Sequence, residues 1–176
     1  MIFTRNIYRL YKDKTTRLLL LGTVITVIIL SASKEYITFN FTESEPTGIY
    51  LLSKVKQYNR NDMVTISSNI NSVIKLANER QYTTASKLLK TILGIPGDRI
   101  IIKNHIVVIN NNIIGMIYSH DSQNRPLPSI IKEGIIPPDQ YFLASRRREN
   151  SFDSRYFGLI SKECIQKKAS PLLVEF

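Results

Sequence analysis

Two residues far apart in the sequence, Ser44 and Lys90, could together cut a peptide bond. A serine hydroxyl is a weak nucleophile until a base accepts its proton, and a lysine can be that base if burial lowers its pKa toward neutrality. Ser44 precedes Pro46 and Gly48, a pattern typical of a sharply turned segment. Lys90 lies in residues 88–93, an apolar stretch that can bury the amine. These residues predict a Ser-Lys dyad.

A second unusual run, residues 151–158, reads Ser-Phe-Asp-Ser-Arg-Tyr-Phe-Gly. It places Asp153 and Arg155 among aromatic side chains. A buried charge without a partner is costly, so polar groups held among aromatics must find partners. We therefore expect Asp153 and Arg155 to form a structural ion pair that braces a site.

Three segments in order resemble the serine, lysine and aspartate boxes of the signal peptidase family. They read SEPTGIY at 44–50, KTILGIPGD at 90–98 and SFDSRYFG at 151–158. The resemblance is closest to the conjugative-transfer branch, the TraF-type peptidases. It implies a mostly antiparallel β catalytic core and a serine endopeptidase that needs no metal or organic cofactor.

The resemblance also assigns the chemistry. It makes Ser44 the nucleophile and Lys90 the general base. Lys87 is the rival base, but the family's lysine stands four residues before the first glycine of the Gly-Ile-Pro-Gly-Asp box, which selects Lys90. The hydroxyl of Thr42 and the backbone N–H of Ser44 would form the oxyanion hole.

The remaining matched residues would support the site. By resemblance, Ser151 orients the lysine, while Asp153 and Arg155 stabilise the site without taking part in the reaction. Gly97 and Asp98 shape the turn after the lysine strand, and Asp98 is expected to be a turn residue rather than a catalyst.

The sequence departs from the family at the nucleophile. Signal peptidase I usually has Ser-Met-x-Pro, whereas this chain has Ser44-Glu45-Pro46, the shorter spacing of the conjugative branch. Glu45 replaces the usual Met, which normally packs near the site. The replacement of Met by Glu45 leaves open what shape the substrate cleft has and, because activity depends on that shape, whether the chain is active. The residues before Ser151 read Arg148-Glu149-Asn150, another departure from signal peptidase I.

The N-terminus predicts a membrane anchor. Five basic residues and one acid lie within residues 1–17, and residues 18–32 carry no charge. A basic stretch before an apolar run sets membrane orientation. We predict a cytoplasmic segment at 1–17, a signal-anchor helix at 18–33 and an exported peptidase domain at 34–176. The alternative is a cleaved signal peptide, since Ser31-Ala32-Ser33 offers small residues.

This topology predicts a single-pass protein of the bacterial cytoplasmic (inner) membrane, with its catalytic domain on the periplasmic side. The formal net charge of +10 invites a nucleic-acid interpretation, but no recognition-helix or zinc-finger pattern accompanies it. The expected partner is instead a membrane-tethered precursor, by resemblance a pilin of a conjugative or type IV secretion system.

Hydrophobic periodicity predicts a mainly β domain with one short helix. The helix is predicted at 71–81, a hairpin turns over Lys103-Asn104, and residues 119–138, with four prolines, form a long loop. Strands are predicted at 49–55, 63–67, 88–95, 99–102, 105–109, 141–144 and 171–174.

Other functions have weaker support. A Ser-His-Asp hydrolase would need His120 and Asp121 as base and orienting acid, but adjacent residues point apart. The single cysteine, Cys164, and two histidines do not provide the ligands of a zinc or iron site. A general signal peptidase I acting on many preproteins, and a membrane-anchored assembly subunit without catalysis, both remain open.

Overall fold

The computed structural model describes residues 14–33, 35–68, 70–82 and 87–175, without the side chains of 28–30, 32, 33 and 78. The chain divides into two compact units, Met1–Ile37 and Thr38–Phe176. Most of the predicted cytoplasmic segment 1–17 lies outside the described residues.

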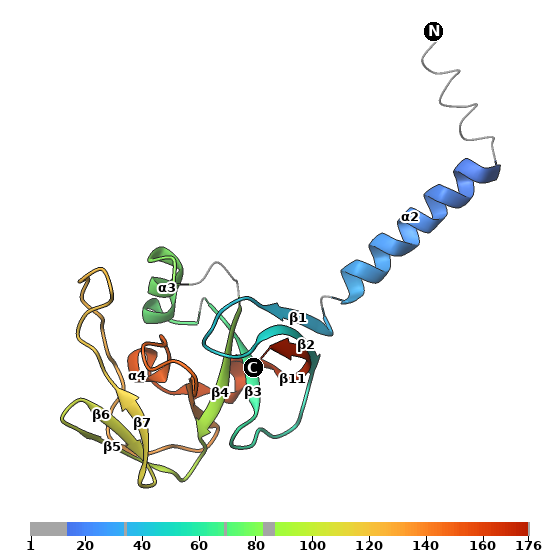
Figure 1. Cartoon of the computed structure of the whole chain (residues 1–176). Coiled ribbons are helices and arrows are strands. Elements are labelled where there is room, and N and C mark those ends of the chain that lie inside the picture. The colour runs from blue at the N-terminus through green and yellow to red at the C-terminus, as the bar shows by residue number, and fades with distance from the viewer. Residues whose placement is uncertain (1–13, 34, 69, 83–86, 176) are drawn as a thin grey trace. The chain divides into compact units, whose positions relative to one another are not determined.

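The first unit contains helix α2, Lys14–Ser33, which agrees with a helix at the predicted anchor (Figure 1). Apolar side chains emerge all around it, with Leu18, Leu19 and Val24 each more than half exposed. The hydroxyls of Thr23 and Thr26 each donate at 2.8 Å to the carbonyl four residues earlier, so these two polar groups are satisfied within the helix.

Among the described residues, no helix has the length and hydrophobicity needed to cross a membrane. The transmembrane anchor and the domain boundaries derived from it stay predictions.

The second unit is built on a seven-stranded sheet with the order β1-β2-β11-β3-β4-β9-β10 (Figure 1). Every neighbouring pair from β2 to β10 is antiparallel. Strand β4, which carries Lys90, lies between β3 and β9, so its backbone is paired on both edges. The strands are Ile37–Asn40 (β1), Thr47–Ser53 (β2), Met63–Ser67 (β3), Lys87–Gly94 (β4), Gln140–Ala144 (β9), Ile160–Ser161 (β10) and Ile165–Glu175 (β11).

A smaller antiparallel sheet, in the order β7-β6-β5-β8, follows β4 in the chain. Its strands are Arg99–Lys103 (β5), Ile106–Ile109 (β6), Asn112–Met116 (β7) and Gly134–Ile135 (β8). Helix α3 is Ser72–Glu79, helix α4 is Ser154–Phe157, and Lys162–Cys164 forms one turn of 3-10 helix.

Most predicted elements are present, but strands β1, β7 and β10 and helix α4 were not predicted, and some predicted elements differ in extent. The hairpin turn is at Asn104-His105, one residue later than predicted; both residues have positive φ, so β6 begins at Ile106 rather than at 105. Strand β8 and the bridge between His120 and Pro126 interrupt the predicted loop 119–138. Strand β11 extends far beyond 171–174, because it pairs with both β2 and β3.

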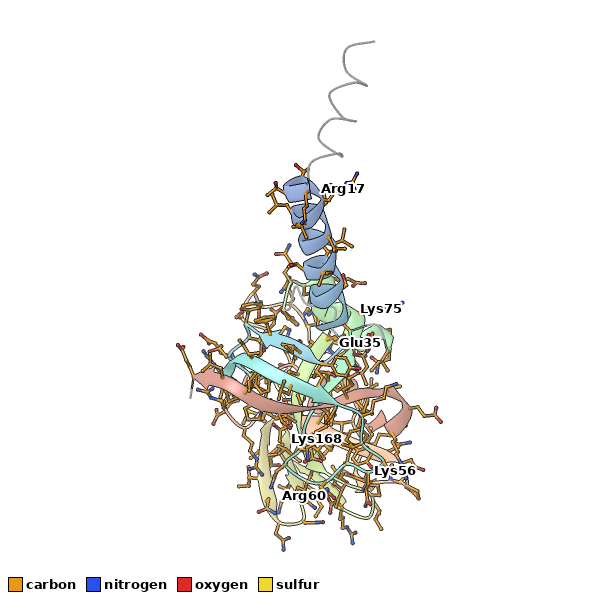
Figure 2. All side chains as sticks on the ribbon, turned by 90° about the vertical axis from the view of Figure 1, so that its right-hand side faces the viewer. Arg17, Glu35, Lys56, Arg60, Lys75 and Lys168 are labelled. Atoms are coloured by element: carbon orange, nitrogen blue, oxygen red, sulfur yellow. The ribbon has the colours of Figure 1, made fainter. Side chains whose placement is uncertain are left out.

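The basic side chains come from several elements of the second unit. Lys56 and Arg60 lie between β2 and β3, Lys75 on α3 and Lys168 on β11 (Figure 2). Two of them form ion pairs, Arg60 with Asp98 and Lys168 with Asp62, each at 2.6 Å.

Candidate active site

The turn that carries Ser44 connects β1 to β2 and is organised by the side chain of Asn40. Its carboxamide oxygen accepts the Thr42 N–H at 3.1 Å and the Thr42 hydroxyl at 2.7 Å. Its amide nitrogen donates to the carbonyl oxygens of Thr42, Glu45 and Pro46 at 2.9–3.0 Å. Asn side chains often replace backbone hydrogen bonds in turns. The nucleophile candidate is thus held in a fixed turn although no helix or strand contains it.

Ser44 itself is half-buried and lies beside Thr42, with 3.3 Å between the two hydroxyl oxygens. Thr42 gives its single hydroxyl hydrogen to Asn40, so Ser44 is the donor in this pair. The Tyr50 hydroxyl donates to the Pro46 carbonyl at 2.6 Å and fixes the end of the turn to β2. Burial raises the pKa of Tyr50 to about 12, so this donor keeps its proton.

Lys90 is buried on β4, with 5% of its surface exposed. Its Nζ donates to the Ser151 hydroxyl at 2.7 Å. Burial lowers the pKa of Lys90 below its ordinary value of 10.5, because an ammonium ion loses hydration there. The negative charges of Asp153 and Glu45 oppose this shift. A buried lysine with a lowered pKa is the condition for a lysine base.

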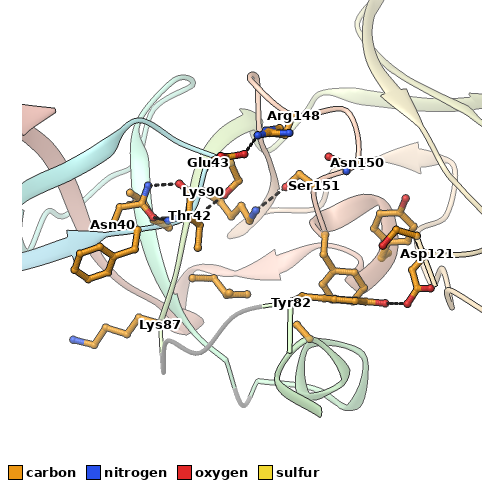
Figure 3. Close-up of a pocket in the computed structure, with 18 of the residues that line it drawn as sticks. Asn40, Thr42, Glu43, Tyr82, Lys87, Lys90, Asp121, Arg148, Asn150 and Ser151 are labelled. Atoms are coloured by element: carbon orange, nitrogen blue, oxygen red, sulfur yellow. Dashed lines mark hydrogen bonds and ion pairs between the residues drawn. The ribbon is translucent and has the colours of Figure 1, made fainter. Parts of the chain in front are cut away.

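Ser44, Lys90, Ser151 and Thr42 line one cavity of about 630 Å³ in the second unit. Figure 3 shows Lys90 and Ser151 joined across it, with the Glu43–Arg148 ion pair nearby. No hydrogen bond joins Ser44 Oγ to Lys90 Nζ in the described part of the chain. Catalytic hydrogen bonds are often long before substrate binds, so this absence does not rule out the dyad. Both predicted dyad residues line the same cavity.

Asp153 and Arg155 form a buried ion pair beside this cavity, each at most 1% exposed. The guanidinium binds the carboxylate twice, Nε to Oδ1 at 2.9 Å and Nη2 to Oδ2 at 2.8 Å. Arg155 also donates to the carbonyls of Met116, Glu149 and Ser151 at 2.7–3.0 Å. The pair therefore fixes the backbone of the residue that contacts Lys90.

Gly97 and Asp98 lie outside the cavity lining. Gly97 has φ of +90°, a conformation that glycine adopts readily. The buried carboxylate of Asp98 accepts the Ile95 N–H at 2.7 Å and pairs with Arg60. Its contacts are those of a turn residue.

Glu45 is buried, with 3% of its surface exposed, but does not line the cavity. Its carboxylate accepts the Thr91 hydroxyl at 2.8 Å. Burial raises the pKa of Glu45, while the Thr91 hydrogen bond and the charge of Lys90 act in the opposite direction. Glu45 thus acts on the site through its charge, which affects the pKa of Lys90, and not as part of the cavity lining.

Comparison with known proteins gives the family. Residues 13–173 match the family described as "Signal peptidase, peptidase S26". This chain belongs to peptidase family S26. A conjugal transfer protein TraF of Agrobacterium fabrum strain C58 is 29% identical over 142 residues, 76% of this chain and 80% of the relative. A TraF of Agrobacterium tumefaciens strain 15955 is 27% identical over 176 residues, 92% and 97% of the two chains.

Signal peptidase I P of Bacillus subtilis subsp. natto is 34% identical to the S26 chain over 85 residues, only 44% of this chain and 46% of that one. Likeness to the TraF proteins extends along most of the sequence, whereas likeness to this signal peptidase covers less than half. The predicted TraF-type branch of the family is confirmed.

Alternative catalytic residues have other contacts in this S26 chain. Lys87 lines the cavity but is only half-buried, and it points away from Lys90 (Figure 3). His120 is exposed and contacts the Ser119 hydroxyl at 3.0 Å. The Asp121 carboxylate binds Tyr82 and Arg125 at 2.6 and 2.7 Å instead. Within the described residues, no three His, Cys, Asp or Glu side chains gather as metal ligands would.

Two residues of the candidate site, Asn40 and Ser145, were not predicted from the sequence. Asn40 carries a weak signal, since an Asn just before a Ser-, Pro- and Gly-containing segment is typical of turn formation. Ser145 follows β9 and contacts the carbonyl of Ser44, a contact between residues 101 positions apart that no local pattern reveals.

Proposed function

We propose that this chain is a membrane-anchored serine endopeptidase with a Ser44-Lys90 dyad that processes an exported precursor. The observation that carries the proposal is the buried Lys90 amine, 2.7 Å from the Ser151 hydroxyl and lining the same cavity as Ser44. Such burial favours the neutral amine, the form that can accept a proton.

In the proposed mechanism, Ser44 Oγ attacks the scissile carbonyl carbon while its proton passes to Lys90 Nζ. The oxyanion is held by the Ser44 N–H and the Thr42 hydroxyl, which must turn from Asn40 to donate. The Lys90 ammonium then protonates the leaving amine. In the second half, Lys90 takes a proton from water as the water attacks the acyl-Ser44 ester, and Ser44 recovers its proton from Lys90.

The proposed substrate is a membrane-tethered precursor, most specifically the pilin of a conjugative or type IV secretion system. The naming of the two long-matching relatives as conjugal transfer proteins supports this choice. The site would act at the outer face of the cytoplasmic membrane, on a precursor with small side chains on the acyl side of the cut. A general signal peptidase I is the alternative, supported by a likeness to signal peptidase I P that covers 44% of this chain.

Cleavage in cells tests the proposal. A pilin precursor and, in parallel, a general secreted preprotein are each co-expressed with wild type, Ser44→Ala or Lys90→Ala. Lys87→Ala is the matched control, because Lys87 is on the same strand and lines the same cavity. We expect wild type and Lys87→Ala to cleave the pilin precursor, while the other two reach normal membrane levels and lose at least about 10³-fold in rate.

Three other outcomes would contradict parts of the proposal. Cleavage by Ser44→Ala and Lys90→Ala at the wild-type rate would exclude the dyad and favour a non-catalytic assembly subunit. Loss of cleavage in Lys87→Ala alone would move the base to Lys87. Faster cleavage of the general preprotein than of the pilin precursor would favour the function of a general signal peptidase I. The mass of the processed pilin separates hydrolysis from cyclisation by the substrate's own amine, since a linear product carries one additional water.

A further inference from the structure

Ser145 directly follows β9 and is buried, with 6% of its surface exposed. Its hydroxyl donates to the backbone carbonyl of Ser44 through a short hydrogen bond. The same oxygen accepts the N–H groups of Arg147 and Arg148, each at 3.1 Å. A hydroxyl has one hydrogen and two acceptor sites, so every hydrogen-bonding position of this side chain is used. The proposed mechanism assigns no role to Ser145.

These bonds continue as far as the lysine. The carbonyl of Arg148 accepts the Ser151 N–H at 3.2 Å. The Ser151 hydroxyl then accepts from Lys90 Nζ at 2.7 Å. Four hydrogen bonds, joined through the covalent structure of Arg148 and Ser151, therefore connect the backbone of Ser44 to the amine of Lys90. The loop 145–151 supplies every intermediate contact.

Two further contacts near Ser145 and the loop are weaker. Its N–H donates to Asp153 Oδ2 at 3.5 Å, a weak bond toward the buried ion pair. An exposed ion pair between Glu43 and Arg148 also joins the loop to the nucleophile turn, which is the turn between β1 and β2 that carries Ser44. Exposed ion pairs contribute little to stability. The buried Ser145 hydroxyl is therefore the main tie between the turn and the loop.

We propose that Ser145 is a positioning residue that fixes the nucleophile turn relative to the loop that orients Lys90. The inference rests on the proposed Ser44-Lys90 function. The Ser44 carbonyl belongs to the peptide unit that directly follows the Cα of the nucleophile, so holding it restrains the backbone from which the Ser44 side chain projects. Misplacement of a reacting group by about 1 Å can lower a rate about 100-fold.

The test is steady-state cleavage of a pilin-derived peptide by the full-length membrane protein. In Ser145→Ala we expect kcat to fall about 10–100-fold while KM stays within about twofold, because the turn loosens and the substrate cavity is kept. Ser145→Thr keeps the hydroxyl and should restore most of kcat. The pH midpoint of activity should remain that of wild type in Ser145→Ala, since the Lys90–Ser151 contact is intact.

Ser154→Ala is the matched control. Its buried hydroxyl accepts the N–H of Leu143 at 2.9 Å, on the strand β9 that Ser145 follows, and Ser154 does not line the cavity. We expect it to lower the urea midpoint of unfolding as much as Ser145→Ala does, with kcat within about threefold of wild type. Ser145→Ala with wild-type kcat, or with a loss no larger than that of Ser154→Ala, would overturn the assignment. Equal activity of wild type and Ser44→Ala would instead overturn the proposed function, and the Ser145 assignment with it.

Discussion

At the scale of single residues, the site depends on a lysine that folding buries at a cost. Lys90 has a lowered pKa in the folded protein, so its burial destabilises the fold at neutral pH. The penalty is complete below the lowered pKa and disappears as the pH rises toward 10.5, the ordinary value. Residues of functional sites often lower the stability of the folded protein in this way.

Glu45 should keep the Lys90 pKa higher than burial alone would make it, because its negative charge favours the ammonium form. Replacing Glu45 by Gln preserves an acceptor for the Thr91 hydroxyl and removes the charge. We therefore expect Glu45→Gln to lower the Lys90 pKa further, and the rising part of the pH–rate curve to move to lower pH. Measured profiles of the two proteins check this. An unchanged midpoint, or one moved to higher pH, would mean that Glu45 is neutral or does not act on Lys90.

Asp153→Ala should destabilise the fold by about 3–5 kcal/mol, because it leaves the buried Arg155 guanidinium without its carboxylate. Activity should fall as well, since Arg155 holds the carbonyl of Ser151. Urea unfolding measures the effect. The control is the double variant Asp153→Ala with Arg155→Met, which removes the stranded charge and should recover part of the stability. Full stability with lost activity would give Asp153 a direct catalytic role.

At the scale of elements, sequence patterns predicted strand β4, which carries Lys90. They did not predict the contacts that connect the segments of the site. Strand β4 was predictable, because an apolar run around one lysine is a strong local signal. The extent of β11 was not, since Lys167, Lys168 and Pro171 interrupt its apolar pattern while pairing with two strands maintains it. Strand β1 has four residues, and β7 contains a glycine with φ of +149°. Short or irregular strands give little periodicity.

The same limit applies to the candidate site. Ser44, Lys90 and the Asp153–Arg155 pair belong to motifs with characteristic spacing, which the sequence displays. Ser145 acts through a contact with Ser44 that exists only after β9 is placed beside β4. A single serine that joins two distant segments does not change the hydrophobic periodicity of the sequence. Its role can therefore be recognised only in the folded structure.

Gly48 allows β2 to approach β11 closely, which gives an element-scale prediction. It has φ of +138°, and an added Cβ would lie 2.1 Å from the carbonyl oxygen of Leu173. We expect Gly48→Ala to cost at least about 2 kcal/mol of unfolding free energy, from strain and a backbone clash. Gly97→Ala is the control: its φ is +90°, but no atom lies within 4 Å of the added Cβ, so about 1 kcal/mol is expected. Equal losses in urea unfolding would contradict the clash.

At the scale of the whole molecule, the proposed function requires an anchor that leaves residues 34–176 outside the cytoplasm. We predict that the full chain stays in the membrane fraction after alkaline carbonate washing. A C-terminal alkaline phosphatase fusion should be active, because that reporter folds only in the periplasm, whereas a fusion of the same enzyme after Lys12 should be inactive. Recovery of the intact chain in the soluble fraction, or the reverse pattern of reporter activity, would contradict the topology.

The central claim is that neutral Lys90 activates Ser44, and the most direct measurement is acylation of Ser44 as a function of pH. Wild type and Lys90→Met are mixed with a pilin-derived peptide ester, quenched, digested and analysed by mass spectrometry. We predict an acyl group on the peptide that contains Ser44, formed at a rate that rises with pH around a midpoint below 10.5. Lys90→Met should show no such rise and at least about 10³-fold slower acylation. Acylation of Ser44 at the same rate in both proteins, or a wild-type rate independent of pH, would contradict it.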